Sequence, residues 1–409
     1  MTRPLLVIYL TIFVNLVGFG IIIPLLPFYA ETFGASPFVI GMLFASFSLS
    51  QLVASPLLGE LSDRYGRRPV LIFSLIGTAL SFAMLAVAQS LVMLFAARIV
   101  DGLSGGNITT ARAYIADVTT HEDRARAFGM LGAAFGLGFI IGPALGGAFS
   151  YISYTAPIWA AAAITIVATA LAWFWLPETF HRTRAGGVSP WTALQELSGR
   201  SHLRVLFSAD FIYWMAFAVY QTAFALFGAR RFGFDAAETG YLLSAFGVLG
   251  VIVQGGLVGR VVGRFGARPT LTAGLLFAAI GWGGSALTHS VPVFVAMLVP
   301  GALGIGLCNA TLSTLISNAA GPQEQGRVQG AAGALESLGR TLGPLWGTAA
   351  LQTFGEGKPF GIAAMLLVGA AGITLRYHPP ARVASETSTE SHLPPSARPP
   401  AGSRDHRAD

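Results

Sequence analysis

The chain has 409 residues, of which 54% are hydrophobic and 11% are charged. A mean hydropathy of +0.65 and 50 glycines exclude an ordinary soluble domain, which would need a larger polar surface. The net charge of +6 does not indicate nucleic-acid binding, because the basic residues punctuate apolar segments and do not gather on one polar face. The single cysteine, Cys308, excludes an intrachain disulfide framework. This composition predicts an integral membrane protein.

Twelve apolar segments are long enough to cross a bilayer as helices, since one span needs about 20 residues. The first six are expected at residues 5–29, 38–60, 69–88, 91–116, 127–149 and 155–176. The second six are expected at residues 204–228, 237–259, 269–288, 291–319, 327–353 and 359–377. The first segment predicts a span and not a cleaved signal, because no small-residue cleavage site follows it. We therefore expect an all-α membrane fold of two six-helix bundles.

Changes in composition divide the chain into four parts. Residues 1–176 are expected to form the N-terminal bundle, and residues 204–377 the C-terminal bundle. Residues 177–203 contain several Arg, Gly and Pro residues and predict a cytoplasmic linker with an amphipathic piece around Trp191–Leu197. Residues 378–409 are rich in Pro, Ser and charge, so they cannot form a packed core and predict a disordered cytoplasmic tail.

The basic residues predict the orientation of the helices. Fourteen arginines fall on the loops and helix ends of one side before the tail is counted, whereas Arg230, Arg231 and Lys358 fall on the other. Short loops rich in Arg and Lys stay on the cytoplasmic side. We therefore expect both termini in the cytoplasm and the protein in the plasma membrane, which is the inner membrane of a bacterium.

A motif at residues 59–69 returns two hundred residues later. Five of its residues recur at an offset of 200, namely Gly59, Arg64, Gly66, Arg68 and Pro69, which match Gly259, Arg264, Gly266, Arg268 and Pro269. Asp63 is replaced by Gly263 in the second copy. Both copies lie between apolar runs. The repeat indicates that the chain is a duplicated membrane unit.

A second repeat supports the same conclusion. Gly138, Gly142, Pro143 and Gly146 in the fifth span match Gly339, Gly343, Pro344 and Gly347 in the eleventh span at an offset of 201. Glycines at four-residue spacing allow another backbone to approach closely, and bending of this stretch during transport is an equal alternative. Two repeated halves predict a solute site at their interface near the bilayer midplane.

Three segments together resemble the major facilitator superfamily. They are residues 59–68, the run Arg98-x-x-Asp101-Gly102 in the fourth span, and residues 132–147 with the Gly142-Pro143 pair. Residues 18–27, 113–117 and 176–179 are similar to the tetracycline efflux proteins within that family. The resemblance covers the whole chain apart from the tail. It implies a transporter that works by alternating access, exchanges protons for small drugs, needs no cofactor or metal, and acts as a monomer.

Two positions depart from the tetracycline exporters. Their first span carries an intramembrane aspartate three residues before a Gly-x-Gly, and the residue here is Asn15. The position of a second acidic residue, in their third span, is Ser81 here. Asparagine cannot titrate, so either proton coupling has moved to another carboxylate or the cargo and coupling differ from the tetracycline case.

The segment around Asp63 predicts a latch between the two halves. Asp63 is expected to accept hydrogen bonds from Arg67, to lie near Asp117, and to face the N-terminal end of the eleventh span, which carries a partial positive charge. The simpler alternative is that Arg64, Arg67 and Arg68 only anchor the topology. The gating residues predicted here are Gly59, Asp63, Arg64, Gly66, Arg67, Arg68 and Asp117.

Charged residues within spans are candidates for function, because they are costly in lipid. The two pairs singled out for proton coupling are Arg98 with Asp101 and Glu336 with Arg340. Their i, i+3 and i, i+4 spacings are also those of internal ion pairs. Asp210 in the seventh span lies nearer the cytoplasmic end, and it is expected to attract cations in a vestibule or to be merely solvated.

Aromatic and amide residues within spans suit amphiphilic aromatic cargo. The pocket candidates are Asn15, Phe19, Asn107, Phe135, Tyr213, Phe217, Gln221 and Trp346, with few charges among them. We expect about half of such residues to face lipid or neighbouring helices instead.

The sequence leaves two other functions open. The run Gly102-Leu103-Ser104-Gly105-Gly106 fits the Gly-x-Ser-x-Gly pattern of serine hydrolases, but none of the seven histidines lies well inside a span to act as a base. Proton-coupled transport of a small metabolite on the same fold is the other alternative. The reading favoured by the sequence is a proton-driven exporter of small amphiphilic molecules, which is not an enzyme and has the bilayer, protons and cargo as its partners.

Overall fold

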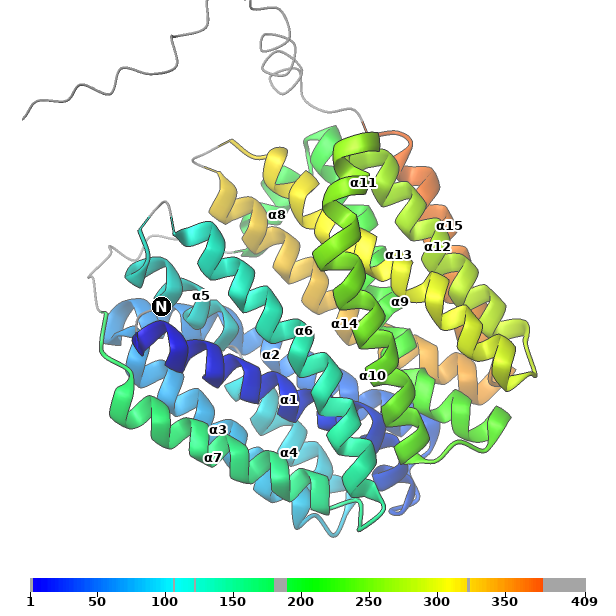
Figure 1. The fold of residues 1–409 in the computed structure, drawn as a ribbon, viewed down its shortest axis with the longest axis horizontal. Helices are drawn as coiled ribbons and strands as arrows, with labels where there is room; N and C mark the ends of the chain where they lie inside the picture. Colours follow the sequence, from blue (N-terminus) through cyan, green and yellow to red (C-terminus); the bar gives the residue numbers. More distant parts are fainter. Residues whose placement is uncertain (1–2, 106, 121–122, 180–189, 322–323, 378–409) are drawn as a thin grey trace, which may run out of the picture.

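The structure is a computed structural model that describes residues 3–105, 107–120, 123–179, 190–321 and 324–377, and these residues are almost entirely helical (Figure 1). The first-half helices are α1 (Arg3–Glu31), α2 (Pro37–Tyr65), α3 (Arg67–Ala86), α4 (Leu91–Ser104), α5 (Asn107–Val118), α6 (Arg124–Ser150) and α7 (Ala156–Trp175). A short helix, α8 (Pro190–Leu197), follows. The later elements are α9 (Ser201–Phe232), α10 (Ala236–Ile252), the π-helical turn η1 (Val253–Leu257), α11 (Val258–Phe265), α12 (Ala267–Leu287), α13 (Val291–Asn318), α14 (Gln325–Phe354) and α15 (Lys358–Thr374).

Each of the twelve expected spans corresponds to one of these helices or to a consecutive set of them. Nine segments of the described chain are long and apolar enough to cross a membrane, and α10, η1 and α11 together make one of them. The expected fourth span is divided into α4 and α5, so the prediction of one continuous helix over 91–116 was wrong. The eleventh, α14, carries Arg327, Glu336 and Arg340, and the twelfth, α15, has only 17 residues.

Most of the extensive helix–helix contacts lie within one half. In the first half α1 packs on α6, α3 on α7 and α2 on α4, and in the second half α9 packs on α14 and α12 on α13 and α15. The two halves meet where α6 lies beside α10 and where α2 lies beside α14 (Figure 1). This arrangement is the all-α membrane fold of two six-helix bundles that the duplicated sequence predicts.

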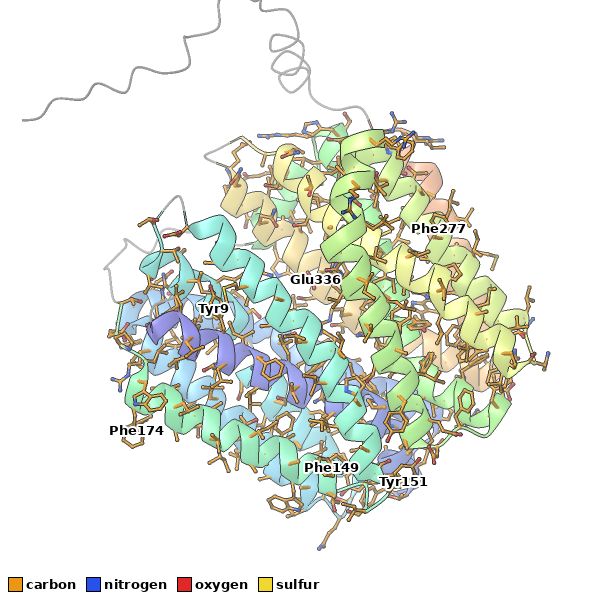
Figure 2. All side chains as sticks on the ribbon, in the orientation of Figure 1. Tyr9, Phe149, Tyr151, Phe174, Phe277 and Glu336 are labelled. Atoms are coloured by element: carbon orange, nitrogen blue, oxygen red, sulfur yellow. The ribbon has the colours of Figure 1, made fainter. Side chains whose placement is uncertain are left out.

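The outer surface of the bundle is apolar, as a lipid-facing surface must be. Phe174 is 78% exposed, and Phe149 and Phe277 are also exposed on the outside of the helices (Figure 2). Glu336 instead lies in the middle of the molecule, between the two halves (Figure 2). Hydrophobic side chains on the outside and charged ones on the inside are the pattern of a protein that encloses a polar site within a bilayer.

The repeated glycines bring pairs of helices into close contact. A side chain at Gly142 on α6 would meet the Gly20 Cα and the Val17 carbonyl oxygen of α1, each at 2.7 Å. A side chain at Gly343 on α14 would meet the Met215 carbonyl oxygen of α9 at 2.4 Å. The same repeat therefore serves helix packing in both halves. Helix α6 stays helical through Pro143, and the Ile140 carbonyl accepts a hydrogen bond of 2.7 Å from Ser244 of α10.

Both copies of the repeated motif end one helix and begin the next at a glycine. Gly66 has φ +106° and Gly266 has φ +85°, a region that favours glycine because it has no Cβ. Helix α2 extends to Tyr65, so Asp63 lies in the last turn of a helix, and the expectation that the second span ends near residue 60 was wrong. The sharp turn at Gly66 brings the end of α2 against the start of α3.

Helix α8 is bound to the beginning of α14. Arg327 of α14 forms an ion pair with Glu196 of α8, and Arg200 forms hydrogen bonds of 2.7 and 2.8 Å with the carboxylate of Glu324. The apolar face of α8 is covered, since Ala193 and Leu197 are buried. The expected linker thus contains a helix that is attached to the second half. Residues 180–189 of the linker and the predicted tail, 378–409, lie outside the described residues.

Candidate functional site

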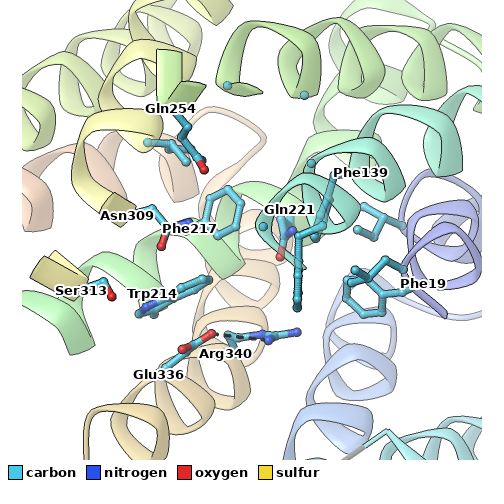
Figure 3. Close-up of a pocket in the computed structure, with 18 of the residues that line it drawn as sticks. Phe19, Phe139, Trp214, Phe217, Gln221, Gln254, Asn309, Ser313, Glu336 and Arg340 are labelled. Carbon is cyan, nitrogen blue, oxygen red and sulfur yellow. Dashed lines mark ion pairs between the residues drawn. The ribbon is translucent and has the colours of Figure 1, made fainter. Parts of the chain in front are cut away.

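A cavity of about 740 Å³ lies between the two halves (Figure 3). Its walls come from α1 to α6 of the first half and from α9, α10, α13 and α14 of the second. The π-helical turn η1 contributes Gln254 and Gly255. A volume of this size fits a drug-sized molecule, because such ligand sites measure roughly 300–1,000 Å³.

Six of the eight predicted pocket residues line this cavity. They are Asn15, Phe19, Phe135, Tyr213, Phe217 and Gln221. Trp346 is not among the lining residues, and it packs against the hydrophobic core instead, so its prediction was wrong. The side chain of Asn107 lies outside the described residues. Residues that face one cavity from helices far apart in the sequence cannot be selected by residue type alone, which explains the miss.

Aromatic rings form much of the cavity wall. The rings of Tyr213 and Phe217 are stacked with their centroids 6.2 Å apart, and Trp214 packs edge-on against Phe217 at 5.8 Å. On the opposite wall, Phe19 of α1 packs edge-on against Phe139 of α6 at 6.0 Å. Figure 3 shows Phe19, Trp214 and Phe217 around the same space. Flat apolar walls of this kind suit an aromatic ligand.

The cavity also carries charged residues. Its lining includes Asp101, Arg112, Asp210, Glu336 and Arg340. They come from four different helices, so only the packing of the helices brings them to one cavity.

Arg98 and Asp101 form a buried ion pair beside the cavity. Their closest oxygen and nitrogen atoms are 2.6 Å apart, and the side chains are 1% and 8% exposed. The Arg98 guanidinium also lies 4.3 Å from the centre of the Phe47 ring. Ser81, which stands at the position of the second acidic residue of the tetracycline exporters, is buried, and its hydroxyl donates a 2.8 Å hydrogen bond to the Thr78 carbonyl. A fully enclosed pair of this kind is costly to break, since each ion would be left without water or a partner.

Glu336 and Arg340 form a looser pair that faces the cavity (Figure 3). The two groups are 3.8 Å apart, beyond hydrogen-bonding distance, and Glu336 is 34% exposed. The Arg340 guanidinium lies 5.8 Å from the centre of the Phe19 ring across the cavity. This pair therefore links the second half to an aromatic wall of the first.

Asp210 is buried and faces the cavity, so the alternative of a merely solvated residue was wrong. It is 4% exposed, and it lines the cavity from α9. Trp214, one turn further along α9, lines the same cavity. The expectation of a solvated residue was wrong because α9 packs closely on α14, which shields this side of the helix.

The predicted gating residues converge on Arg67. Its guanidinium pairs with Asp63 at the end of α2 and, at 3.2 Å, with Asp117 at the end of α5. Arg68 donates a 2.6 Å hydrogen bond to the Trp173 carbonyl at the end of α7. Arg64 lies over the Tyr65 ring, and a side chain at Gly59 would meet no atom within 4 Å. The motif thus ties three helix ends of one half together.

Glu178 joins this cluster, and the sequence analysis gave it no role. Its carboxylate accepts hydrogen bonds from the backbone nitrogens of Arg67 at 2.9 Å and Arg68 at 3.3 Å, the first residues of α3. A carboxylate at this position satisfies free N–H groups and favours the helix dipole. The signal was the run Leu176-Pro177-Glu178-Thr179, but only the fold brings it to the start of α3.

In this conformation the structure does not join Asp63 to the start of α14. Within the described chain, Asp63 pairs with Arg67, and the residues at the start of α14 instead bind α8 and its neighbour Arg200. The expected contact between Asp63 and the N-terminal end of α14 is therefore not among the ion pairs of the described residues. Contacts between α2 and α14 occur at their other ends, where the Phe38 backbone N–H donates to Gln352 at 3.1 Å.

Ser104, the proposed hydrolase nucleophile, is packed between helices. It is 7% exposed, and a side chain at Gly77 of α3 would overlap its hydroxyl oxygen at 2.0 Å. Close packing of α3 on α4 therefore requires small residues at both Gly77 and Ser104. The Gly-x-Ser-x-Gly match is therefore explained by helix packing.

Comparison with known proteins agrees with this geometry. The Major Facilitator Superfamily model matches residues 8–344 and 249–400. The chain is 35% identical to tetracycline resistance protein, class C, of Escherichia coli, over 85% of this chain and 89% of that protein. It is 29% identical to multidrug resistance protein 2 of Bacillus subtilis, over 89% and 92% of the two chains.

A solved structure shares the fold. The human organic anion transporter MFSD10 superposes with a TM-score of 0.72 at 24% identity, covering 91% of this chain and 99% of that one. The family match spans most of the chain, and the relatives are similar along nearly their whole length. The chain therefore belongs to the Major Facilitator Superfamily, a family of membrane transporters and not of enzymes.

Proposed function

We propose that this protein exports small amphiphilic drugs, tetracycline-like compounds included, in exchange for protons. The observation that carries the proposal is the cavity between the halves, which combines aromatic walls with amides and charged pairs. The similarity to a tetracycline resistance protein and a multidrug resistance protein supports the same cargo class. A transporter of this type acts as a monomer in the plasma membrane, with both termini in the cytoplasm.

Alternating access is supported by unequal contact between the halves. At one end, Gly41 of α2 packs against Thr348 of α14, and Gly147 of α6 packs against Gly240 of α10. At the end that carries the N-terminus, side chains placed at Gly129 and Gly132 of α6 would meet nothing within 4 Å, nor would those at Gly330 and Gly333 of α14. With the termini in the cytoplasm, this is a state open to the cytoplasm.

The opposite state would require the halves to close at the terminal end. We propose that residues 1–176 and 204–377 rock against each other, with residues 177–203 as the connection. Asp63 then comes to face the N-terminal end of α14, which is positively polarised, while Arg67 keeps it positioned. The latch forms and breaks once in each transport cycle.

Proton coupling is proposed for the two ion pairs in the cavity. Asp101 is held by Arg98, and Glu336 by Arg340, so each carboxylate can exchange its arginine partner for a proton when the helices move. Asn15 lines the same cavity but cannot titrate. This substitution is also the observation that favours the alternative function, proton-coupled transport of a small metabolite on the same fold.

A drug-susceptibility panel tests the cargo. The chain is expressed in a pump-deficient bacterial host, and the inhibitory concentrations of tetracyclines and other amphiphilic drugs are measured against the empty vector. Export predicts a rise for at least one compound. No shift for any compound, with the protein present in the membrane, favours metabolite transport instead.

The proton dependence is tested in vesicles with an imposed pH gradient. Cargo movement driven by the gradient is compared for the wild-type protein, Asp101→Asn and Glu336→Gln. Loss in at least one variant, with gradient-independent exchange of cargo retained, supports the proposed coupling residues. Full gradient-driven transport in both variants overturns them. Glu60→Gln, an exposed carboxylate of α2 outside the cavity, serves as the matched control.

A further inference from the structure

The three carboxylates that line the cavity differ in how their charge is balanced. Asp101 is paired with Arg98 at 2.6 Å. Arg340 lies 3.8 Å from Glu336, and Arg112 lines the same cavity. Asp210 differs from both carboxylates, because it lines the cavity and none of the ion pairs within the described chain includes it.

A buried carboxylate without a cation is costly. Asp210 is 4% exposed, and Trp214, one turn further along α9, lines the cavity beside it. A carboxylate that stays charged at such a position loses its hydration, which costs several kcal/mol. Its charge is balanced either by a proton or by a positive group from outside the chain, and the side of Asp210 that is open to such a group is the cavity.

The residues next to Asp210 on the cavity wall are suited to an aromatic cation. Trp214 and Phe217 follow it at i+4 and i+7, so the three lie on one face of α9. Both rings line the cavity, and Figure 3 shows them facing the same space as Glu336. Aromatic faces attract cations and stack on aromatic rings. The carboxylate and the rings therefore present charge recognition and apolar surface side by side.

We propose that Asp210, Trp214 and Phe217 form the subsite for the positively charged group of the cargo, so that the transporter selects amphiphilic aromatic cations. This inference names the cargo class within the proposed function and rests on the same cavity. Arg340 is paired with Glu336 and Arg98 with Asp101, whereas Asp210 is in none of the ion pairs of the described chain. The bound cation supplies the partner that Asp210 lacks.

Binding of two matched probes tests the subsite. Tetraphenylphosphonium carries a permanent positive charge, and triphenylphosphine oxide has similar aryl groups without a net charge. Their affinities for the purified full-length protein are measured at constant pH for the wild type, Asp210→Asn, Asp210→Glu and the control Glu60→Gln. We expect Asp210→Asn to lower the affinity for the cation by at least about tenfold and the affinity for the neutral probe by less than about threefold. Asp210→Glu should recover part of the loss.

The neutral probe also reports whether the variant is folded. An equal loss of both probes in Asp210→Asn means that Asp210 supports the fold or a proton step, and overturns the proposal. No loss of the cation, or no binding of it by the wild-type protein, overturns it as well. The result is separable from export, since a drug panel without any shift leaves the Asp210-dependent binding of the cation intact.

Discussion

The two halves share a motif but use it differently. In both, a glycine with positive φ joins two helices, and an arginine two residues later binds the carbonyls at the end of the last span of its half. Arg68 reaches Trp173, and Arg268 reaches Thr374 at 3.1 Å. Asp63 and Arg67 belong to the first half alone, because Gly263 and Ala267 replace them. The shared part is structural, and the charged part is specific to one half.

The fourth and tenth spans differ in the same way. Arg98 and Asp101 correspond at an offset of 200 to Leu298 and Gly301, which are buried among apolar neighbours. A side chain at Gly281 would meet the Gly301 backbone at 2.5 Å. The second half therefore uses close helix packing where the first half holds an ion pair. The two halves therefore share their packing surfaces, whereas the charged pair is present in the first half and replaced by Leu298 and Gly301 in the second.

The largest effect is expected from the pair in the fourth span. Asp101→Asn leaves the Arg98 charge buried without a partner, so we expect the free energy of unfolding to fall by about 3–5 kcal/mol. Proton-driven transport should be lost as well. The double change Arg98→Leu with Asp101→Gly copies the second half, and it should regain most of the thermal stability without regaining transport. Thermal unfolding of the purified protein and vesicle transport measure both. A double variant as unstable as Asp101→Asn would contradict the comparison.

The glycine repeats should behave alike in the two halves. Gly142→Ala and Gly343→Ala each place a methyl group against the backbone of a neighbouring helix, so each should lower stability by about 1–3 kcal/mol. Gly129→Ala on α6 and Gly330→Ala on α14 are the controls, because their added methyl groups meet nothing within 4 Å. Thermal unfolding measures all four. Effects confined to one half would show that the repeat is not a shared packing surface.

The repeated motif separates structure from gating. Arg67→Gln removes the partner of both Asp63 and Asp117, and we expect transport to fall by about tenfold with a stability loss of only about 1 kcal/mol. Arg268→Gln should reduce stability to a similar degree while transport changes little, because its partners are backbone carbonyls. Transport rates normalised to protein in the membrane measure the difference. Equal transport in the two variants would remove the proposed division between the halves.

The smallest effect is expected at the linker. The hydrogen bond from Arg200 lowers the pKa of Glu324, which lies outside the spans. A lowered folded-state pKa gives stability that is present above the ordinary pKa and is lost as the pH falls through the folded value. The pair is exposed, so Arg200→Gln should cost less than about 0.5 kcal/mol near neutral pH and nothing in acid. Thermal unfolding across pH checks this, and an effect that grows in acid would contradict it.

Much of the architecture could be predicted because each span carries its own signal. A helix in lipid must be apolar over a fixed length, so the twelve segments were identified one by one. The division of the fourth span was missed, because glycines such as Gly105 are common in membrane helices and do not by themselves predict a break. The extension of α2 to Tyr65 was missed because its last turn is polar and leaves the apolar pattern.

The candidate site was less predictable, because its residues are distant in the sequence. The pairs Arg98 with Asp101 and Glu336 with Arg340 were evident from helical spacing alone. The environment of Asp210 was not, since it depends on which face of α9 packs on α14. Trp346 failed for the same reason. An aromatic residue in a span can face lipid, the core or the cavity, and the local sequence does not distinguish these three environments.

The sequence by itself determined the membrane class, the duplication and the family, because these depend on composition and on order along the chain. The tertiary structure alone decided that Glu178 caps α3, that Asp63 is paired within its own half, and that Asp210 lines the cavity without an ion pair among the described residues. The physical reason is that charge balance and burial are properties of neighbours in space. Those neighbours come from helices up to hundreds of residues apart and exist only once the two halves have packed.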